Sequence, residues 1–263
     1  MLLVIDIGNT NTVIGVYENE ELKSRFRVAT DLKKTSDELV ATLFNMLAIK
    51  QIAVENIEDT IMSCVVPDVM YNWQSANRKL FDREAIVVDS DTPTFLTIDY
   101  ENPREVGADR IVDAVAAYSK YGGPAIVVDM GTAITFDVVT EDKRYLGGSI
   151  APGIRIAQDG LFGATAKLPK IELMVPTSAI GKNTSEAINA GIVYGYIGMI
   201  DSLIEILERE MKEKYGIDES DITVVATGGF SELISQSSKF IEIIEPDLML
   251  EGLRIIYERN KNL

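Results

Sequence analysis

The chain has 263 residues, of which 46% are hydrophobic and 25% charged, and its formal net charge is -16. This composition is typical of a globular protein with one large domain or two small ones, and the acidity argues against nucleic acid as a partner, because a duplex binder presents a basic face. The sequence has no histidine and one cysteine, Cys64, which excludes histidine-dependent catalysis, histidine metal sites and an intrachain disulfide.

The N-terminal segment is not predicted to be a targeting signal. Residues 2–5 are apolar, but Asp6 follows them and no basic stretch precedes them. No apolar run approaches the length of a membrane span, and the single cysteine fits a reducing compartment. We therefore expect a cytoplasmic protein without a membrane partner.

The first half of the chain is predicted to open with a β-meander and to continue with alternating helices and strands. Three apolar runs separated by polar turns are typical of strands: 2–5, 13–17 and 23–28. Thr35 and Glu38 form a capping-box pattern, and apolar residues recur behind it at helical spacing. Further helices are expected at 68–81 and 111–121, and strands at 60–66 and 85–88. Residues 89–110 contain two prolines and no clean periodicity, so they are predicted to form a long functional loop.

The second half of the chain repeats the beginning of the first. Residues 125–139 have the pattern of residues 3–17, a strand, an Asp-x-Gly turn and a second strand, so that Asp129 corresponds to Asp6. A further hairpin follows, and then a long helix at 184–215, strands at 223–226 and 240–244, and a helix at 248–260. The repeat predicts an α/β protein of two similar domains, 1–115 and 116–263, whose Asp-x-Gly turns face one cleft. The alternative is that two glycine turns are alike by chance.

The turn at residues 6–12 has the chemistry of a phosphate site. Gly8 allows an anion to approach backbone N–H groups, and the next four residues, Asn9, Thr10, Asn11 and Thr12, add neutral donors. Asp6, at the end of a buried strand, could hold Mg²⁺ through water. The turn therefore suits a nucleoside triphosphate with its metal, although a hairpin turn with Asx caps is the alternative. Neither a P-loop nor a Rossmann fingerprint is present.

A second polar motif lies at residues 103–110. Gly107 can present the next residues at a helix start, where Asp109 could accept a proton from a substrate hydroxyl and Arg110 could bind a carboxylate or phosphate. The alternative is that Asp109 only caps the helix while Arg110 is solvated. In the same way, Asn183 or Thr184 could serve only as the cap of the long helix, and the glycines at 228 and 229 could be ordinary turn residues.

Six motifs in chain order together resemble the type III pantothenate kinases. They are Asp6-x-Gly-Asn-Thr10, Pro103 followed by Gly107-Ala-Asp-Arg110, Asp129-x-Gly-Thr-Ala133, Gly147-Gly-x-Ile-x-Pro-Gly153, Leu168-Pro169 and Gly181-Lys-Asn-Thr184. The resemblance runs from residue 1 to about residue 255, and it departs from the family at Ile134, where threonine is common. The first motif alone is shared across the actin-like kinases, whereas the ordered combination is specific.

The resemblance implies two duplicated actin-like, ribonuclease H-like domains with mixed sheets and an interdomain cleft. It implies ATP-dependent phosphorylation of pantothenate to 4′-phosphopantothenate, with Asp109 as general base on the substrate hydroxyl. It assigns ATP to Asp6, Ile7, Gly8, Asn9, Thr10, Asn11, Thr12, Val13 and Thr132. It assigns pantothenate to Tyr100, Gly107, Ala108, Asp109, Arg110 and Thr184. It further implies Mg²⁺ at Asp6 through water, a monovalent cation, K⁺ or NH₄⁺, at Asp129, and a homodimer.

Two other functions fit parts of the same pattern. One is an actin-like regulatory or assembly protein that binds a nucleotide without transferring its phosphate. The other is a sugar kinase. Acceptor-dependent release of ADP separates the first from a kinase, and a panel of acceptor alcohols separates the second.

Overall fold

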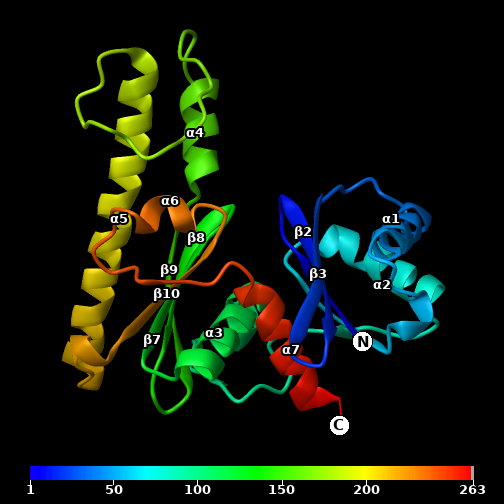
Figure 1. Cartoon of the computed structure of the whole chain (residues 1–263). Coiled ribbons are helices and arrows are strands. Elements are labelled where there is room, and N and C mark those ends of the chain that lie inside the picture. The colour runs from blue at the N-terminus through cyan, green and yellow to red at the C-terminus, as the bar shows by residue number, and fades with distance from the viewer. Residues whose placement is uncertain (262–263) are drawn as a thin grey trace. The chain divides into compact units, whose positions relative to one another are not determined.

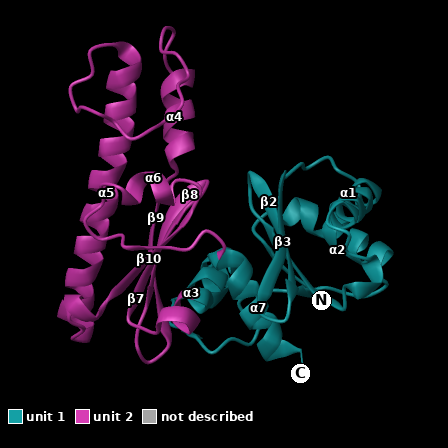
Figure 2. Ribbon diagram, in the orientation of Figure 1, with its two compact units in different colours: residues 1–116, 248–263 teal, residues 117–247 magenta. Residues whose placement is uncertain are grey.

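The computed structural model describes residues 1–261, and they form two compact units (Figure 2). The first unit contains residues 1–116 and the chain from residue 248 onward, and the second contains residues 117–247. The division falls within one helix, α3 (Ala108–Tyr121).

The first unit is a mixed sheet with helices on both faces (Figure 1). The strands of this sheet are β1 (Leu2–Ile7), β2 (Asn11–Glu18), β3 (Glu21–Ala29), β4 (Asp59–Cys64) and β5 (Ile86–Val87), and the short strand β6 (Thr97–Ile98) is not part of it. The other helices of the unit are α1 (Ser36–Ile49), α2 (Pro67–Phe81) and α7 (Leu248–Asn260), with 3₁₀ turns at Val54–Asn56 and Pro103–Glu105. The sheet order is β3-β2-β1-β4-β5, with β2 antiparallel to both neighbours and β4 parallel to both of its own.

The two faces of this sheet are buried by different helices. Apolar residues of β1 such as Ile5 share one core with Leu43 of α1 and Trp73 of α2. On the opposite face α7 packs against β1 and β2, where Leu250 approaches Gly15. Because helices bury both faces of β1, that strand is a continuous apolar run, as a doubly covered strand requires.

Five strands of the second, six-stranded sheet repeat the sheet of the first unit. The strands of the second unit are β7 (Ala125–Met130), β8 (Ala133–Val139), β9 (Arg144–Pro152), β10 (Thr223–Gly228) and β11 (Ile243–Ile244), and its helices are α4 (Ile154–Gly163), α5 (Thr184–Tyr215) and α6 (Ser231–Ser235). The order β9-β8-β7-β10-β11, with its strand directions, matches β3-β2-β1-β4-β5. The predicted internal repeat is therefore present in the fold, with β7 in the place of β1.

Several element boundaries differ from those expected from the sequence. The strand expected at 60–66 ends at Cys64. Helix α2 begins at Pro67, a residue that suits the first position of a helix. The strand expected at 240–244 is reduced to β11. The expected loop at 89–110 contains β6 and a 3₁₀ turn, and its last three residues, 108–110, form the start of α3. Helix α4 was not expected at all.

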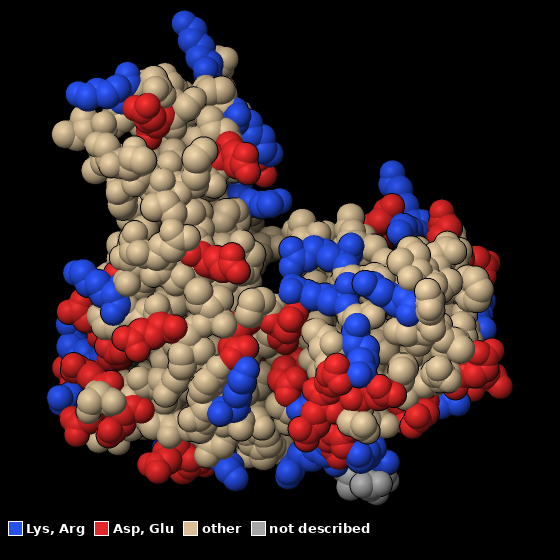
Figure 3. All heavy atoms as spheres, viewed as in Figure 1, with Lys and Arg blue, Asp and Glu red and all other residues tan. Residues whose placement is uncertain are grey.

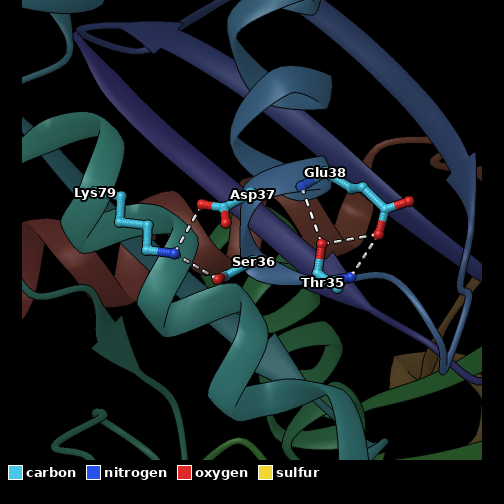
Figure 4. A network of polar contacts seen from close by, with 5 residues as sticks. All are labelled: Thr35, Ser36, Asp37, Glu38 and Lys79. Atoms are coloured by element: carbon cyan, nitrogen blue, oxygen red, sulfur yellow. Dashed lines mark hydrogen bonds and ion pairs between the residues drawn. The ribbon is translucent and has the colours of Figure 1, made fainter.

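The start of α1 is fixed by side-chain contacts (Figure 4). Thr35 Oγ1 accepts from the Glu38 N–H at 3.4 Å, and Glu38 Oε2 accepts from the Thr35 N–H at 2.8 Å. This is the predicted capping box. Lys79 of α2 donates to Ser36 Oγ and to Asp37 Oδ1, both at 2.8 Å, which ties α2 to the first turn of α1.

Helix α5 is unusually long, with 32 residues. By length and composition alone it could cross a membrane, and it is the one helix in residues 1–261 that could. A core helix passes the same test, so the observation is weak evidence for a membrane. Only 28% of its most apolar window is buried, which leaves apolar surface on this helix without a cover in the single chain.

Candidate functional site

The turn between β1 and β2 is the first part of the candidate site. The Gly8 N–H donates to Asn11 O at 3.1 Å and closes the turn, and the side chains of the next three residues are exposed. Thr12 is buried, and its hydroxyl lies 3.0 Å from that of Thr30, which also donates to Gly8 O at 2.7 Å. The turn is therefore held by the hydroxyl groups of Thr12 and Thr30. The side chains of Asn9, Thr10 and Asn11 are exposed to solvent.

Asp6 is the second-last residue of β1 and carries the carboxylate next to this turn. Its Oδ1 accepts from Ser63 Oγ at 2.7 Å, because the parallel register of β1 and β4 sets these residues side by side. Burial raises the pKa of Asp6 to about 7, although the Ser63 hydrogen bond lowers it, and the charge of Asp109 raises it further. Burial thus opposes the ionised form of Asp6, and a nearby cation would favour it.

Asp109 lies in the first turn of α3 in the same unit. Its Oδ1 accepts from the Arg110 N–H at 2.8 Å, and a Cβ at Gly107 would lie 2.4 Å from that oxygen. Glycine is therefore needed at 107 to make room for the carboxylate. Burial raises the pKa of Asp109, against the opposing effects of the Arg110 N–H and guanidinium.

The alternatives considered for Asp109 and Arg110 do not match their surroundings. Helix α3 begins at Ala108, so Asp109 is inside the helix and is not its N-cap. Arg110 is only 7% exposed, so its guanidinium is not a solvated surface group. The electrostatic interaction between Asp109 and Asp6 places two carboxylates of the first unit near each other.

In the second unit, Asp129 stands at the position of Asp6. Its two carboxylate oxygens lie against glycines: a Cβ at Gly228 would be 2.6 Å from Oδ1, and one at Gly131 would be 3.1 Å from Oδ2. Gly228 also has a φ of 91°, a left-handed conformation that other residues rarely adopt. Gly228, the last residue of β10, is therefore required for close packing beside Asp129. Thr132, in the following turn, is exposed.

The start of α5 borders a cavity in the second unit. Asn183 is the N-cap, since its side chain accepts from the Glu186 N–H at 2.9 Å, and Thr184 is left exposed in the first turn. An open cavity of about 500 Å³ lies there, lined by Leu168, Gly181, Lys182, Asn183, Thr184, Ala187 and Ile188. Tyr100, in the first unit, is 37% exposed.

Any metal at these turns must be held by few protein ligands. Within residues 1–261 no three cysteine, aspartate or glutamate residues lie together as a metal site. A single buried carboxylate such as Asp6 suits Mg²⁺, which keeps several waters and shares its ligands with substrate phosphates. The described residues thus fit a cation that arrives with a nucleotide, and they do not fit a protein-made metal cage.

Two residues of the site were missed by the analysis of the sequence. Ser63 donates to Asp6, and Thr30 braces the phosphate turn. The signal for Ser63 is a polar residue near the end of an apolar strand, which acquires meaning only once the register with β1 is known. Thr30 follows β3 and gives no signal in the sequence.

Known proteins and structures resemble this chain along its length. A family model described as type III pantothenate kinase matches residues 2–206. A type III pantothenate kinase from Finegoldia magna is 48% identical over 263 residues, covering 100% of this chain and 98% of that protein.

Two solved structures share the fold at lower identity. A conserved putative Baf family transcriptional activator from Campylobacter jejuni has a TM-score of 0.60 and 19% identity, over 99% of this chain and 100% of that one. The activator of the 2-hydroxyisocaproyl-CoA dehydratase from Clostridium difficile, with bound ADPNP, has a TM-score of 0.51 and 10% identity, over 100% and 97% of the two chains. At these identities the likeness is one of fold alone.

Proposed function

The chain belongs to the type III pantothenate kinase family, and we propose that Asp109 is the general base of its reaction. The fold is the actin-like α/β fold expected from the sequence, with mixed sheets. The activity is the ATP-dependent phosphorylation of pantothenate to 4′-phosphopantothenate, in the biosynthesis of coenzyme A. Family membership decides against a nucleotide-binding regulator and against a sugar kinase.

The observation that supports this role is the placement of the Asp109 carboxylate in the first turn of α3, against Gly107 and within electrostatic reach of Asp6. As the pantothenate hydroxyl oxygen bonds to the γ-phosphorus of ATP, its proton passes to the Asp109 carboxylate, and the bond from that phosphorus to the ADP oxygen breaks. The raised pKa of Asp109 makes the carboxylate a stronger proton acceptor at neutral pH. With no histidine in the chain, a carboxylate is a natural proton acceptor.

A divalent metal accompanies ATP in kinases, and we infer that it is Mg²⁺ held by Asp6 through water. Such an ion neutralises charge on the phosphates. We further infer that Asp129 holds K⁺ or NH₄⁺, and that Thr132 and the turn at residues 6–13 contact ATP. Two features support the turn: Asn9, Thr10 and Asn11 are exposed, and Asp6 is a carboxylate whose ionised form burial opposes and a cation would favour.

For pantothenate we infer contacts from Tyr100, Gly107, Ala108, Arg110 and Thr184. Arg110 offers a planar fork that matches a carboxylate, which pantothenate carries. The assignment of Thr184 is supported by its surroundings. Asn183 caps the helix, and Thr184 lines an open cavity.

We also infer a homodimer in the cytoplasm. Large apolar side chains are exposed on α4, on the segment after it and on α5: Ile156, Leu161, Met174, Val175, Ile180, Tyr194 and Ile206. Contiguous apolar surface of this kind usually marks a contact between proteins. A second copy of this chain would cover it and complete the substrate site, as the family resemblance implies.

The test is a transfer assay with a matched variant. Protein, Mg-ATP, pantothenate and K⁺ are incubated, and 4′-phosphopantothenate is detected by mass. Asp109→Asn should lower turnover by about 10²–10⁴-fold while calorimetry shows ATP binding unchanged. Asp91→Asn, an exposed aspartate in the same segment, should retain turnover.

Three outcomes would contradict these roles. Product absent with folded wild-type protein would count against the activity itself. Turnover near the wild-type rate in Asp109→Asn would remove Asp109 as the base. Equal rates in K⁺ and Na⁺ would argue against the monovalent cation at Asp129.

A further inference from the structure

Basic side chains follow one another along β3, the edge strand of the first unit. Arg25 and Arg27 project from the same face of the strand, and Lys23 lies at a register shift between β2 and β3. Figure 3 shows lysine and arginine side chains gathered over this part of the first unit. In a chain of net charge -16, such a local excess of positive charge needs an explanation.

The register of the sheet places Arg27 in one row with Asp6. Arg27 pairs with Val13 on β2, and Val13 pairs with Asp6 on β1. Residues that are directly paired project from the same face, so Arg27 and the Asp6 carboxylate share a face. The Cα atoms of Arg27 and Asp6 are two strand spacings apart, roughly 10 Å. An arginine side chain from one strand and a phosphate group bound near the other can span this distance.

The Arg27 end of this row is exposed to solvent, whereas the next rows are covered by a helix. Helix α7 covers the same face further along, where Leu250 approaches Gly15 and Tyr17 donates to Glu251 Oε2 at 3.2 Å. Val13, between Arg27 and Asp6, is only half-buried. Arg27 is exposed, and it makes no hydrogen bond or ion pair with any residue from 1 to 261.

The internal repeat supplies a comparison within the molecule. The corresponding row of the second unit runs from Asp129 through Thr135 to Ile150. Ile150 stands in the place of Arg27 and is 65% exposed. The fold therefore does not require a cation at this position, and the cation is found only in the unit that carries the proposed base and phosphate turn.

We propose that Arg27 is a nucleotide-binding residue, whose guanidinium contacts the phosphates of ATP held at the turn after β1. The inference rests on the proposed role of that turn. Asp6 and Asp109 put two carboxylates near an anionic triphosphate, and the chain has no P-loop lysine to offset them. Arg27 supplies the missing charge in a planar fork that matches phosphate oxygens.

The competing explanation is that the basic row only protects an edge strand. Charged side chains, lysine above all, discourage edge strands from pairing with other chains. That role would be shared by all three residues, and it would not depend on the distance to Asp6. Lys23 lies four residues before Arg27 on the same edge strand and forms exposed ion pairs with Glu18 and Glu21, so it is the control.

The experiment measures Mg-ATP affinity by calorimetry and the KM values for ATP and pantothenate. Arg27→Gln should raise the Kd and KM for ATP about tenfold or more, with the KM for pantothenate and the melting temperature unchanged. Arg27→Lys should fall between wild type and Arg27→Gln, since it keeps the charge and loses the fork. Lys23→Gln, with the same change in charge, should stay within about twofold of wild type.

The possible failures can be told apart. Wild-type protein that forms no 4′-phosphopantothenate would overturn the proposed function before any variant is compared. Active wild-type protein with an Arg27→Gln ATP affinity within twofold of its own would overturn only the role of Arg27. Equal losses in Arg27→Gln and Lys23→Gln would also overturn it, because they would show a general effect of surface charge.

Discussion

At the scale of single residues, the candidate site contains two carboxylates, Asp6 and Asp109, whose ionised forms are disfavoured by burial. Asp6 is a carboxylate that burial drives toward its neutral form, and its partner Ser63 offsets only part of that effect. In the proposed role of Asp6, a cation brought by the nucleotide would restore the ionised form of the carboxylate. Nucleotide binding would then gain free energy that the nucleotide-free protein loses as stability.

Asp6→Asn should separate that cost from the function. The folded pKa of Asp6, about 7, lies above the ordinary aspartate value of 3.8, so the stability of the wild type falls as pH rises through this range, while an asparagine stays neutral. The variant should be more stable than wild type at pH 8, by on the order of 4 kcal/mol, and equal to it below pH 4. Thermal melts across pH measure the difference, and calorimetry should show weakened Mg-ATP binding.

The exposed Asp91→Asn is the control for this effect and should not change the melting temperature at either pH. An Asp6→Asn protein that melts below wild type at pH 8 would contradict the argument. It would mean that the ionised carboxylate stabilises the empty site through contacts that outweigh its burial.

The residues of the site that were predictable are those with a local signature. Asp6, Gly8 and Gly107 stand in short motifs whose chemistry is legible without a fold, and Asp109 follows directly from the same motif. Ser63 and Arg27 take their meaning from strand register, which pairs them with residues far away in the chain. Register depends on which strands become neighbours, and a single sequence does not carry that information directly.

At the scale of elements, prediction succeeded where a period and a cap agreed. Helix α1 begins with the capping box that the sequence indicates. Helix α4 was missed because glycines at 160 and 163 weaken its helical pattern and no side-chain cap precedes it. The strand expected at 240–244 is short because Glu242 interrupts the apolar run and the chain joins β10 only at its last two residues.

Thr35→Ala should test how much the capping box contributes. Removing the hydroxyl leaves the Glu38 N–H without its acceptor, and the unfolding free energy should fall by about 1 kcal/mol. Denaturant unfolding measures the change. Thr42→Ala is the control within the same helix: its hydroxyl donates only to Glu38 O, so alanine there should be neutral or slightly stabilising. Equal losses in both variants would contradict a specific capping effect.

At the scale of the whole molecule, the chain is one fold made twice and then changed differently in each copy. The strand order and the paired aspartates are retained, whereas the row beside Asp6 ends in Arg27 and the row beside Asp129 ends in Ile150. The repeat was visible in the sequence because both copies keep the same strand and turn. The domain division at residue 115 stays a prediction. In the structure α7, from the end of the chain, packs with the first unit.

The second copy also differs by the pair of α4 and α5, which lie side by side and extend beyond their sheet (Figure 1). This pair carries much of the exposed apolar surface of the second unit. A sequence pattern predicts that such a helix is apolar, but it does not say what covers it: core, lipid or another copy of the chain. Since only 28% of the most apolar window of α5 is buried, the single chain does not supply the cover.

A homodimer should therefore be measurable, and it should depend on this surface. Sedimentation should give twice the 29.0 kDa of one chain, and Ile156→Lys, which places a charge on exposed α4, should raise the dimer dissociation constant about tenfold or more. Ile49→Lys is the control, because Ile49 is 73% exposed in the first unit, away from α4 and α5 in the sequence. A monomeric wild type would contradict the dimer. If that monomer bound lipid vesicles, lipid would be the cover, because burying apolar helix surface is favourable against either partner.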